Sequence, residues 1–367
     1  MYSYDNRVVI TLDAGGTNFV FGAMQANKFI IDPITMPSNA GDLDKCLQTM
    51  VAGFKSVIAR LKTKPVAISF AFPGPADYPN GIVGGYLPNF PSFRNGVALG
   101  PFLEYTFGIP VFINNDGDLF AYGEALGGVL PEVNERLRAQ GSAKQYKNLL
   151  GYTFGTGFGV GIVSDGTKLH IGDNSCVETF CLRHKKFPEI MVEDGVAVRA
   201  VKRVYAELSG DKSSLEPKDI FDIAEGKLPG DQKAAQQSFA EMGEVAGDAM
   251  ATAVTFIDGL IVIGGGITAA KKYIMPSLLK ELHSKIKTLS GETLNRVQMK
   301  VYDLDNDAEF AEFAKGDQRA LQVYGTDRFV AYDPQKRIGV MISKMGASNA
   351  ISVGAYAYAL HRLDLNK

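Results

Sequence analysis

Three glycine-rich segments constrain the fold of this chain most strongly, because each follows a strand-like run of apolar residues. The runs at 7–12 (RVVITL), 149–154 (LLGYTF) and 260–263 (LIVI) lead into D-A-G-G-T-N at 13–18, G-T-G-F-G-V-G at 155–161 and G-G-G-I at 264–267. After each of the first two segments a second apolar run follows, which is the pattern of a hairpin whose turn holds the glycines. Because this unit occurs twice, we expect two related halves that face each other across a cleft.

Strand-like and helix-like stretches alternate along the rest of the chain. The apolar runs at 65–72 (PVAISFAF) and 110–114 (PVFIN) read as buried strands. Apolar residues recur at helical spacing in five further stretches, at 41–61, 117–126, 194–208, 235–256 and 349–363. This alternation predicts an α/β fold built on a partly parallel sheet.

The overall composition excludes several classes of protein. The 367 residues are 46% hydrophobic and 21% charged, which is typical of a soluble globular chain long enough for two domains. A formal net charge of -2 gives no general attraction to nucleic acid or to an anionic membrane. No apolar stretch approaches the roughly 20 residues of a membrane span, and the N-terminus has no apolar signal core. We expect a cytoplasmic protein without nucleic-acid or membrane partners, and its three cysteines fit a reducing compartment.

The glycine-rich turns are candidate phosphate-binding loops. Backbone N–H groups reach a phosphate only where no side chain intrudes, and glycines meet that need. In the first turn Thr17 and Asn18 add side-chain donors, and the Asp13 carboxylate is an oxygen ligand suited to Mg²⁺, directly or through water. Each turn also fits a plain bend between strands with no ligand. Their repetition at strand ends, with acidic residues among them, favours nucleotide binding.

The second turn also matches part of a dinucleotide-binding fingerprint. That fingerprint requires a helix directly after the glycines and an acidic residue roughly 20 positions further on. Here the glycines run into Ile162-Val163 and another turn, so the dinucleotide interpretation is disfavoured. The third segment, 264–267, follows a buried strand and precedes a helix-like stretch, and such a junction accepts a nucleotide against backbone.

Asp116 is the candidate general base. It follows a buried strand in Asn114-Asn115-Asp116, at the end of the sheet where open α/β folds place their ligands. A hydroxyl that attacks phosphorus needs an acceptor for its proton, and a carboxylate within hydrogen-bond distance serves. The alternative for Asp116 is helix N-capping, which Asn and Asp do well. Asn89, in L-P-N at 87–89, is a candidate donor to a sugar hydroxyl, with loop capping as its alternative.

Taken in order, these segments resemble the ROK family (repressors, open reading frames, kinases), and specifically its glucokinase-like sugar kinases. To the three glycine segments the resemblance adds P-G-P-A-D at 73–77, L-P-N at 87–89 and N-N-D at 114–116, and it covers roughly residues 7–300 plus the final helix. It implies a two-domain ribonuclease-H-like fold of the actin/hexokinase superfamily with an interdomain cleft, and ATP with Mg²⁺ as cofactors. It further implies that Asp116 is the catalytic base and that Asn89, Asn115 and Asp116 touch the sugar. The nucleotide-binding residues that it implies are Asp13 (with Mg²⁺), Gly15, Gly16, Thr17, Asn18, Gly155, Thr156, Gly157, Gly159, Gly264, Gly265, Gly266 and Ile267.

Two further carboxylates complete the sugar site in that family, and we align them with Glu178 and Glu193. In this alignment Cys181 stands where the family has a histidine, which removes one expected sugar contact. A second alignment places Cys176-Val177-Glu178 on the family's G-C-x-E, and the first is preferred because it keeps both carboxylates. The family's C-x-C-G-x-x-G-C zinc motif is absent. Cys176, Cys181 and His184 are too few for a four-ligand structural zinc, so we expect no zinc and two cysteines that serve as packing residues.

The resemblance also sets expectations for the domain boundaries. We expect one ribonuclease-H-like domain at 1–115 plus 349–367, and a larger one at 116–348. Within it, we expect a segment near 303–345 that is additional to the family pattern and forms an added hairpin or an oligomer contact. A homodimer is among the expected partners. In detail, we expect a surface excursion at 127–149 and a hairpin over 327–343 that turns at Asp333-Pro334-Gln335-Lys336. Because the first glycine turn begins at residue 13, no room is expected for the DNA-binding domain of the family's repressors.

The sequence therefore predicts an ATP-dependent sugar kinase that phosphorylates a hexose hydroxyl, with glucose favoured. The alternatives are a kinase for fructose, N-acetylmannosamine or N-acetylglucosamine, and a non-catalytic sugar sensor of the same fold. An actin-like or chaperone-like ATPase is disfavoured, because it has no need of the polyol-binding residues at 89 and 115–116.

Overall fold

The computed structural model describes residues 2–365, and these fall into two compact units. Of the described residues, the first unit holds 2–131, 160–177 and 344–365, and the second holds 132–159 and 178–343. This division by contacts gives 116–131 and 160–177 to the first unit, whereas the predicted boundary lay at 116. The predicted domain boundaries stay a prediction, because a division by contacts does not identify independently folding domains.

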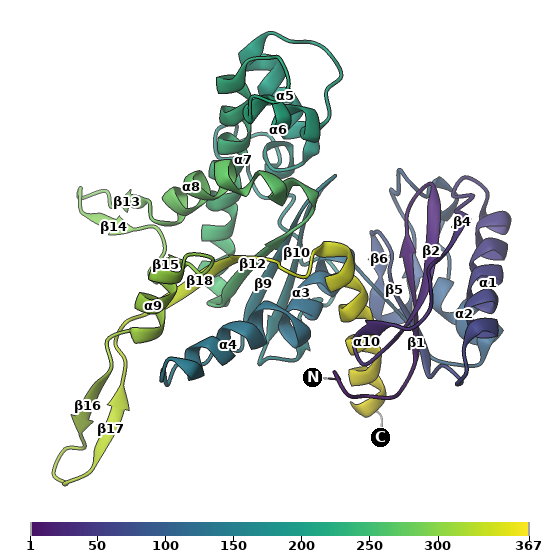
Figure 1. Cartoon of the computed structure of the whole chain (residues 1–367), viewed down its shortest axis with the longest axis horizontal. Helices are drawn as coiled ribbons and strands as arrows, with labels where there is room; N and C mark the ends of the chain where they lie inside the picture. Colours follow the sequence, from purple (N-terminus) through teal and green to yellow (C-terminus); the bar gives the residue numbers. More distant parts are fainter. Residues whose placement is uncertain (1, 366–367) are drawn as a thin grey trace. The chain divides into compact units, whose positions relative to one another are not determined.

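A six-stranded sheet forms the centre of the first unit (Figure 1). Its order is β3-β2-β1-β5-β8, with β4 paired to β2. The strands are β1 (Val9–Ala14), β2 (Asn18–Gln25), β3 (Lys28–Phe29), β4 (Ile34–Pro37), β5 (Ala67–Ala71) and β8 (Val111–Asn114). Strands β1, β5 and β8 are parallel, and the hairpin of β1 with β2 is antiparallel, as the first glycine turn predicts.

Successive side chains of β1 point to opposite faces of the sheet, and each face packs against a different helix. Ile10 belongs to a buried cluster with Phe54 of α1 (Leu43–Arg60), which Asp42 caps by accepting from the N–H of Lys45. Val9 points the other way and packs with Tyr356 of α10 (Ala347–Leu365). A run of consecutive apolar residues is therefore buried on both faces, as expected for a central strand. The final helix packs on the N-terminal strands, which confirms the prediction that it closes on an earlier part of the chain.

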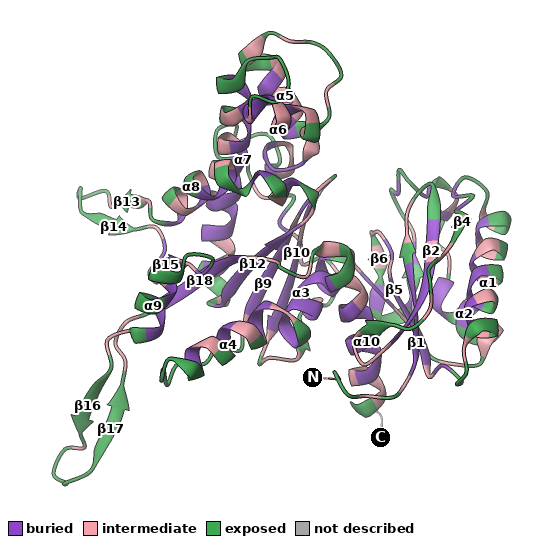
Figure 2. Ribbon diagram, in the orientation of Figure 1, coloured by how far each residue is buried: buried purple, intermediate pink, exposed green. Residues whose placement is uncertain are grey.

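Smaller elements complete this unit. They are β6 (Ala76–Asp77), η1 (Tyr78–Asn80), β7 (Ile82–Val83), η2 (Pro91–Phe93), α2 (Leu99–Phe107), α3 (Asp116–Gly127) and β11 (Lys168–Leu169). Helix α3 is buried along nearly its whole length, as its purple ribbon in Figure 2 shows. It packs against α10, which is also mostly buried.

Two glycines allow α3 and α10 to cross in direct contact. A Cβ added at Gly354 would collide with the carbonyl of Leu119, and one added at Gly123 would collide with the carbonyl of Ala350. The backbones therefore approach more closely than any side chain permits. Because α3 begins at Asp116, this crossing fixes the helix that carries the candidate base.

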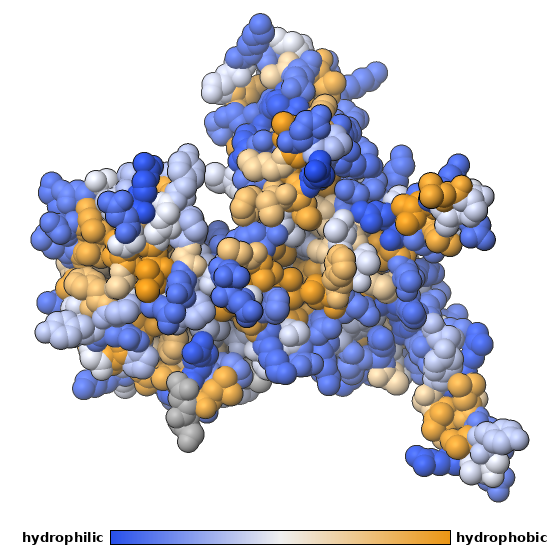
Figure 3. Space-filling view, turned by 180° about the vertical axis from the view of Figure 1, so that it is seen from behind, coloured by the Kyte–Doolittle hydropathy of each residue, from blue (hydrophilic) through white to orange (hydrophobic). Residues whose placement is uncertain are grey.

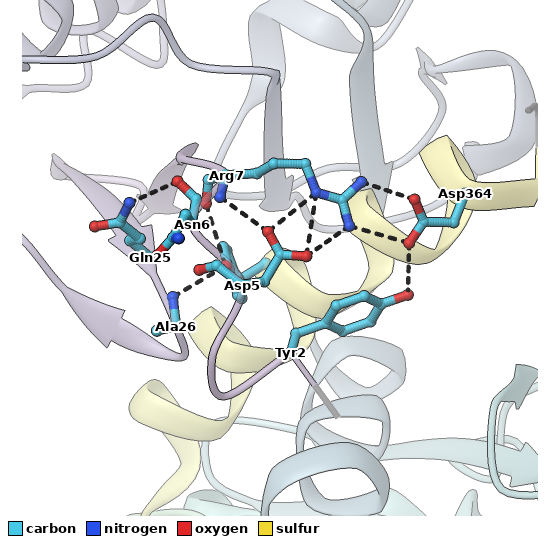
Figure 4. Close-up of polar contacts among 8 residues, drawn as sticks. Tyr2, Asp5, Asn6, Arg7, Gln25, Ala26 and Asp364 are labelled. Carbon is cyan, nitrogen blue, oxygen red and sulfur yellow. Dashed lines mark hydrogen bonds and ion pairs between the residues drawn. The ribbon is translucent and has the colours of Figure 1, made fainter.

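An ion-pair cluster ties the first residues of the chain to the last helix (Figure 4). The guanidinium of Arg7 donates to both carboxylate oxygens of Asp364, at 2.8 and 3.0 Å, and also to Asp5. Tyr2 donates to Asp364 at 3.4 Å, and the hydroxyl of Tyr356 accepts the N–H of Ala26. These bonds join segments more than 300 residues apart in the sequence, so both ends of the chain take part in one unit.

The second unit is built on parallel strands. Its strands β9, β12, β18 and β15 are neighbours in that order, in which β12 pairs in parallel with β9 and β18, and β15 pairs in parallel with β18. The same sheet continues from β9 to β10 and β11, and β11 is counted above with the first unit. The strands are β9 (Leu149–Phe154), β10 (Phe158–Ser164), β12 (Leu260–Gly264), β15 (Lys300–Asp303) and β18 (Arg337–Ile342). Strand β10 begins in the second unit and continues as part of the first.

Helices and two separate hairpins complete the second unit. The helices are α4 (Val129–Ala139), η3 (Val192–Gly195), α5 (Val198–Ser209), α6 (Pro217–Ala224), α7 (Gln232–Ile257), η4 (Gly266–Ala270), α8 (Lys271–Leu282) and α9 (Asp307–Lys315). The hairpins are β13 (Lys285–Lys287) with β14 (Thr293–Asn295), and β16 (Arg319–Gln322) with β17 (Phe329–Tyr332). No helix within residues 2–365 is long and apolar enough to cross a membrane.

Two local predictions are wrong. Residues 127–149 are not a surface excursion, because they contain α4, whose Val133 and Leu137 are fully buried; the many charged residues on its other face hid this stripe. The hairpin expected over 327–343 lies earlier, at 319–332, since residues 337–342 form the buried strand β18. Arg337 begins that strand with its side chain fully buried against Asp333, a partner that the sequence pattern does not show.

The β16–β17 hairpin exposes apolar side chains. All eight of its strand residues are exposed, and they include Leu321, Phe329, Val330 and Tyr332. Figure 3 shows hydrophobic colour along this arm, at the lower right. The segment near 303–345 thus contains a hairpin, while β15, α9 and β18 within it are part of the second unit. That the segment is additional to the family pattern stays a prediction.

We predict that Gly354→Ala lowers the free energy of unfolding by about 1–3 kcal/mol, because the new methyl group pushes α10 away from α3. The usual gain in helix propensity from Gly to Ala would act in the opposite direction. Urea denaturation measures the change. Gly41→Ala is the matched control, because a Cβ at Gly41 meets no atom within 4 Å. Equal stability of the two variants would refute the packing role of Gly354.

Candidate functional site

In the first unit, parallel pairing brings the ends of three strands to one edge of the sheet. Asp13 lies opposite Ala71, and Ala71 lies opposite Asn114. The segments that follow these residues are the first glycine turn, P-G-P-A-D at 73–77 and Asn115-Asp116. Predicted residues that are 100 positions apart in the sequence therefore meet at the carboxyl edge of one sheet.

The first glycine turn is open to solvent and lies against Asn89, a residue that we predict binds the sugar. Asp13, Gly16, Thr17 and Asn18 are exposed. A Cβ at Gly16 would lie 3.0 Å from the Cβ of Asn89, so glycine at this position makes room for the side chain of Asn89. The structure thus brings Asn89 against the turn proposed for phosphate. Glycine at position 15 has a packing reason, because a Cβ there would lie 2.8 Å from the carbonyl oxygen of Asn18.

The start of α3 separates the roles of Asn115 and Asp116. Asn115 is the N-cap, and its Oδ1 accepts the N–H of Gly117 at 2.7 Å. Asp116 is the first residue of the helix, and its exposed carboxyl accepts the same N–H at 2.8 Å. The capping role considered for Asp116 therefore belongs to Asn115. Asn115 also donates to the hydroxyl of Tyr78 at 3.5 Å, a long hydrogen bond.

The surroundings of Asp116 raise the pKa of its carboxyl above the ordinary value. Desolvation by the nearby protein is the largest cause, although water still reaches the side chain. The N–H of Gly117 opposes the rise in pKa, and the negative charge of Asp13 adds to it. A higher pKa makes the carboxylate a better proton acceptor, as a general base requires.

In the second unit, two glycine segments meet at the ends of adjacent parallel strands. Thr153 of β9 lies opposite Gly264 of β12, so the turns that begin at Gly155 and Gly265 follow at the same edge. Gly265 has a φ of 100°, and a Cβ there would collide with the backbone of Phe154. The structure thereby brings together the residues predicted to hold nucleotide at 155–159 and at 264–267. Ile267 itself is buried, with 5% of its surface exposed.

Two of these glycines have no packing reason to be glycine. A Cβ at Gly155 or at Gly266 would meet no atom within 4 Å, and neither residue has the positive φ that favours glycine. Thr156 and Gly266 are exposed. The absent side chains leave open space beside the backbone of both turns, although the N–H of Gly155 itself donates to the carbonyl of Gly157 at 3.2 Å. Such space lets a phosphate approach the backbone closely.

Glu193, in η3, is bonded to the second glycine turn. Its Oε2 accepts the N–H of Phe158 at 2.9 Å, and its Oε1 accepts from Arg199 at 2.8 Å. Arg199 also donates to Asp194. The sequence analysis missed Arg199, because only the folded turn from η3 into α5 brings it to the carboxylate. Glu178 is half-buried in the irregular segment between β11 and η3.

The prediction that the two cysteines near this segment are packing residues is wrong, because both are exposed. Cys176 and Cys181 are both free thiols, and Cys176 donates to the carbonyl of Asn174. His184 is buried, and its Nδ1 accepts the N–H groups of Lys186 and Phe187. Phe180, Phe187 and Ile190 of the same loop are themselves exposed, so these apolar side chains do not bury the two thiols. Within residues 2–365 no three His, Cys, Asp or Glu side chains are grouped as metal ligands, so Asp13 is a single candidate contact for Mg²⁺.

Comparisons with known proteins identify the family and the fold. A model of the ROK family matches residues 9–179. The chain is 60% identical to a solved structure of glucokinase from Parabacteroides distasonis, covering 98% of this chain and 99% of the other, with a TM-score of 0.92. It is 26% identical to the glucokinase of Thermotoga maritima over 325 residues, or 74% of this chain and 89% of that protein.

A more distant structure shares the fold. The ROK family glucokinase from Streptomyces griseus, solved in complex with glucose and AMPPNP, is 18% identical and covers 95% of this chain and 98% of its own, with a TM-score of 0.60. The predicted two-domain fold of the actin/hexokinase type is therefore confirmed. The ordered set of motifs, the fold and the 60% identical relative lead to one conclusion: the chain belongs to the ROK family.

Proposed function

We propose that this chain is an ATP-dependent hexose kinase, with glucose as the favoured substrate. The sugar-kinase prediction agrees with the family and with the two glucokinases that the chain resembles, one over 98% and the other over 74% of its length. We extend the proposal to ATP with Mg²⁺ as cofactors and to a cytoplasmic enzyme. Association into a homodimer stays a prediction.

The observation that carries the proposal is the state of Asp116. This carboxylate follows a parallel strand whose end lies on the same sheet edge as Asp13, and its pKa is raised. Because Asn115 caps the helix, Asp116 is not needed for that structural task. Base-assisted phosphoryl transfer requires a carboxylate with a raised pKa close to the phosphate-binding loop, and Asp116 fits this description without a capping role of its own.

In the proposed mechanism each residue has one task. Asp116 accepts the proton of the attacking sugar hydroxyl, and Asn89, Asn115, Glu178 and Glu193 orient the sugar. Backbone N–H groups of the turns at 15–18 and 155–159 would hold the phosphates of a bound nucleotide, Asp13 would hold Mg²⁺ directly or through water, and 264–267 would support the adenosine. Bound ATP would supply the phosphoryl group, and Mg²⁺ would neutralise charge on its oxygens.

Other hexoses are the main alternative substrates. Cys181 stands in place of a histidine of the family's sugar site, so fructose, N-acetylmannosamine and N-acetylglucosamine remain to be compared with glucose. A coupled assay of ADP release over these four sugars ranks them. Sugar-induced thermal stabilisation without ADP release would identify the non-catalytic sensor instead, and ADP release without sugar would identify an ATPase.

We predict that Asp116→Ala lowers kcat at least roughly a hundredfold with the preferred hexose, because the hydroxyl loses its proton acceptor. The dissociation constant for sugar should rise less than kcat falls, since the asparagine contacts are kept. The assay is steady-state ADP release, with sugar binding followed by calorimetry. Asp173→Ala is a matched control on an exposed carboxylate. Unchanged turnover in Asp116→Ala would remove Asp116 from the role of base.

We predict that Asp116→Asn raises the free energy of unfolding at pH 7. The pKa of Asp116 is raised in the folded state, so its ionisation at neutral pH costs stability. Below the ordinary pKa of an aspartate, near 4, the carboxyl is protonated in both states and the difference disappears. Urea denaturation of the wild type and the variant between pH 3 and pH 8 measures this. A variant that is less stable than the wild type at pH 7 would contradict the assigned pKa shift.

A further inference from the structure

One short segment holds the second glycine turn at both ends. The N–H of Val198 donates to the carbonyl of Gly155 at 2.9 Å, and Glu193 accepts the N–H of Phe158. A Cβ at Gly157, between these two points, would lie 2.8 Å from Oε2 of Glu193. Glycine at 157 therefore makes room for the carboxylate, whereas glycine at 155 leaves space for a ligand.

The carboxylate of Glu193 has acceptor capacity to spare. Two ionised oxygens offer about four lone-pair sites, and the N–H of Phe158 and the guanidinium of Arg199 use two of them. The side chain of Glu193 keeps 20% of its surface exposed. A further donor, such as a sugar hydroxyl, can bind without displacing either bond.

Arg199 fixes where this carboxylate lies. Its guanidinium bonds Glu193 with one nitrogen and Asp194 with another, so both carboxylates of η3 are held from the first turn of α5. Without Arg199, the carboxylate of Glu193 would keep the hydrogen bond from the N–H of Phe158 but would lose its ion pair. Charge-assisted bonds of this kind are stronger than neutral ones and orient their partners.

From these contacts we infer that Glu193 couples sugar binding to nucleotide binding, and that Arg199 is the positioning residue for this coupling. A hydroxyl bound to Glu193 fixes the carboxylate, the carboxylate fixes the N–H of Phe158, and the turn at 155–159 is then ordered before phosphate binds. The inference rests on the proposed function, because it takes Glu193 as a sugar ligand. By linkage, the nucleotide must tighten sugar binding by the same factor.

The test is calorimetric titration with Mg²⁺ and AMPPNP, without and with a saturating concentration of the hexose preferred in the ADP-release assay. AMPPNP prevents turnover, so the complex of protein, sugar and nucleotide persists. In the wild type we expect the sugar to tighten AMPPNP binding at least about fivefold. In Arg199→Met this ratio should fall below about twofold, because Glu193 loses its anchor. A residue with only a structural role would weaken both affinities and leave their ratio unchanged.

Arg203→Met is the matched control. Arg203 lies one turn further along α5 and pairs with Glu207, not with Glu193. This variant should keep the wild-type ratio. If Arg199→Met does not fold, Gly157→Ala supplies the same test, since its methyl group displaces the carboxylate from the other side.

The outcomes separate this inference from the proposed function. A wild-type protein that releases ADP in the presence of sugar but shows no coupling would overturn the inference alone. Full coupling in both Arg199→Met and Gly157→Ala would also overturn it. A wild-type protein that phosphorylates none of the four sugars would refute the proposed function, and the inference with it.

Discussion

The parallel pairing of strands is the constraint on which the rest of this structure depends. Parallel strands end at one edge of a sheet, so the segments that follow them are neighbours whatever their separation in the sequence. In the first unit this rule joins Asp13 to Asn114, and in the second it joins Thr153 to Gly264. Each unit thus gathers its own set of candidate ligand-binding residues, and no side-chain contact is needed to explain why they meet.

The glycines that dominate the motifs do different physical work. Gly123 and Gly354 allow two buried helices to touch, and Gly157 leaves room for the carboxylate of Glu193. Gly155 and Gly266 face open space, where a side chain would be tolerated by the protein itself. Only glycines that face open space, such as Gly155 and Gly266, indicate a ligand directly. A glycine-rich motif is therefore evidence for binding at some of its positions and for packing at others, and the sequence does not separate the two.

Much of the fold followed from the sequence. Hydrophobic periodicity identified α1, α3, α5, α7 and α10, and the glycine turns identified the hairpin of β1 with β2. It failed for α4, where a narrow buried stripe lies among many charges. The predicted hairpin over 327–343 placed a strand where β18 lies but gave it the wrong partner, because β17 pairs with β16 while β18 pairs with β12 and β15. Periodicity marks strands, whereas pairing and burial depend on partners that are distant in the sequence.

The candidate site was predictable in its residue types more than in its bonds. Asp116 and Asn115 stood out as a pair, but only the structure shows that Asn115 is the cap and Asp116 is not. Glu193 was singled out for sugar, while its bonds to Phe158 and Arg199 require the fold of η3 and α5. Spacing in a sequence does not record such bonds, because neither partner lies at a regular interval from the other.

The central claim is that Asp116 takes the proton from the hydroxyl that receives phosphate. A crystal structure of the protein with its preferred hexose, Mg²⁺ and AMPPNP tests it most directly. The account predicts one sugar hydroxyl within about 2.6–3.2 Å of a carboxylate oxygen of Asp116, with that same hydroxyl nearest to the terminal phosphorus. A complex in which the hydroxyl nearest to phosphorus is bonded to another group, with Asp116 turned to solvent, would contradict it.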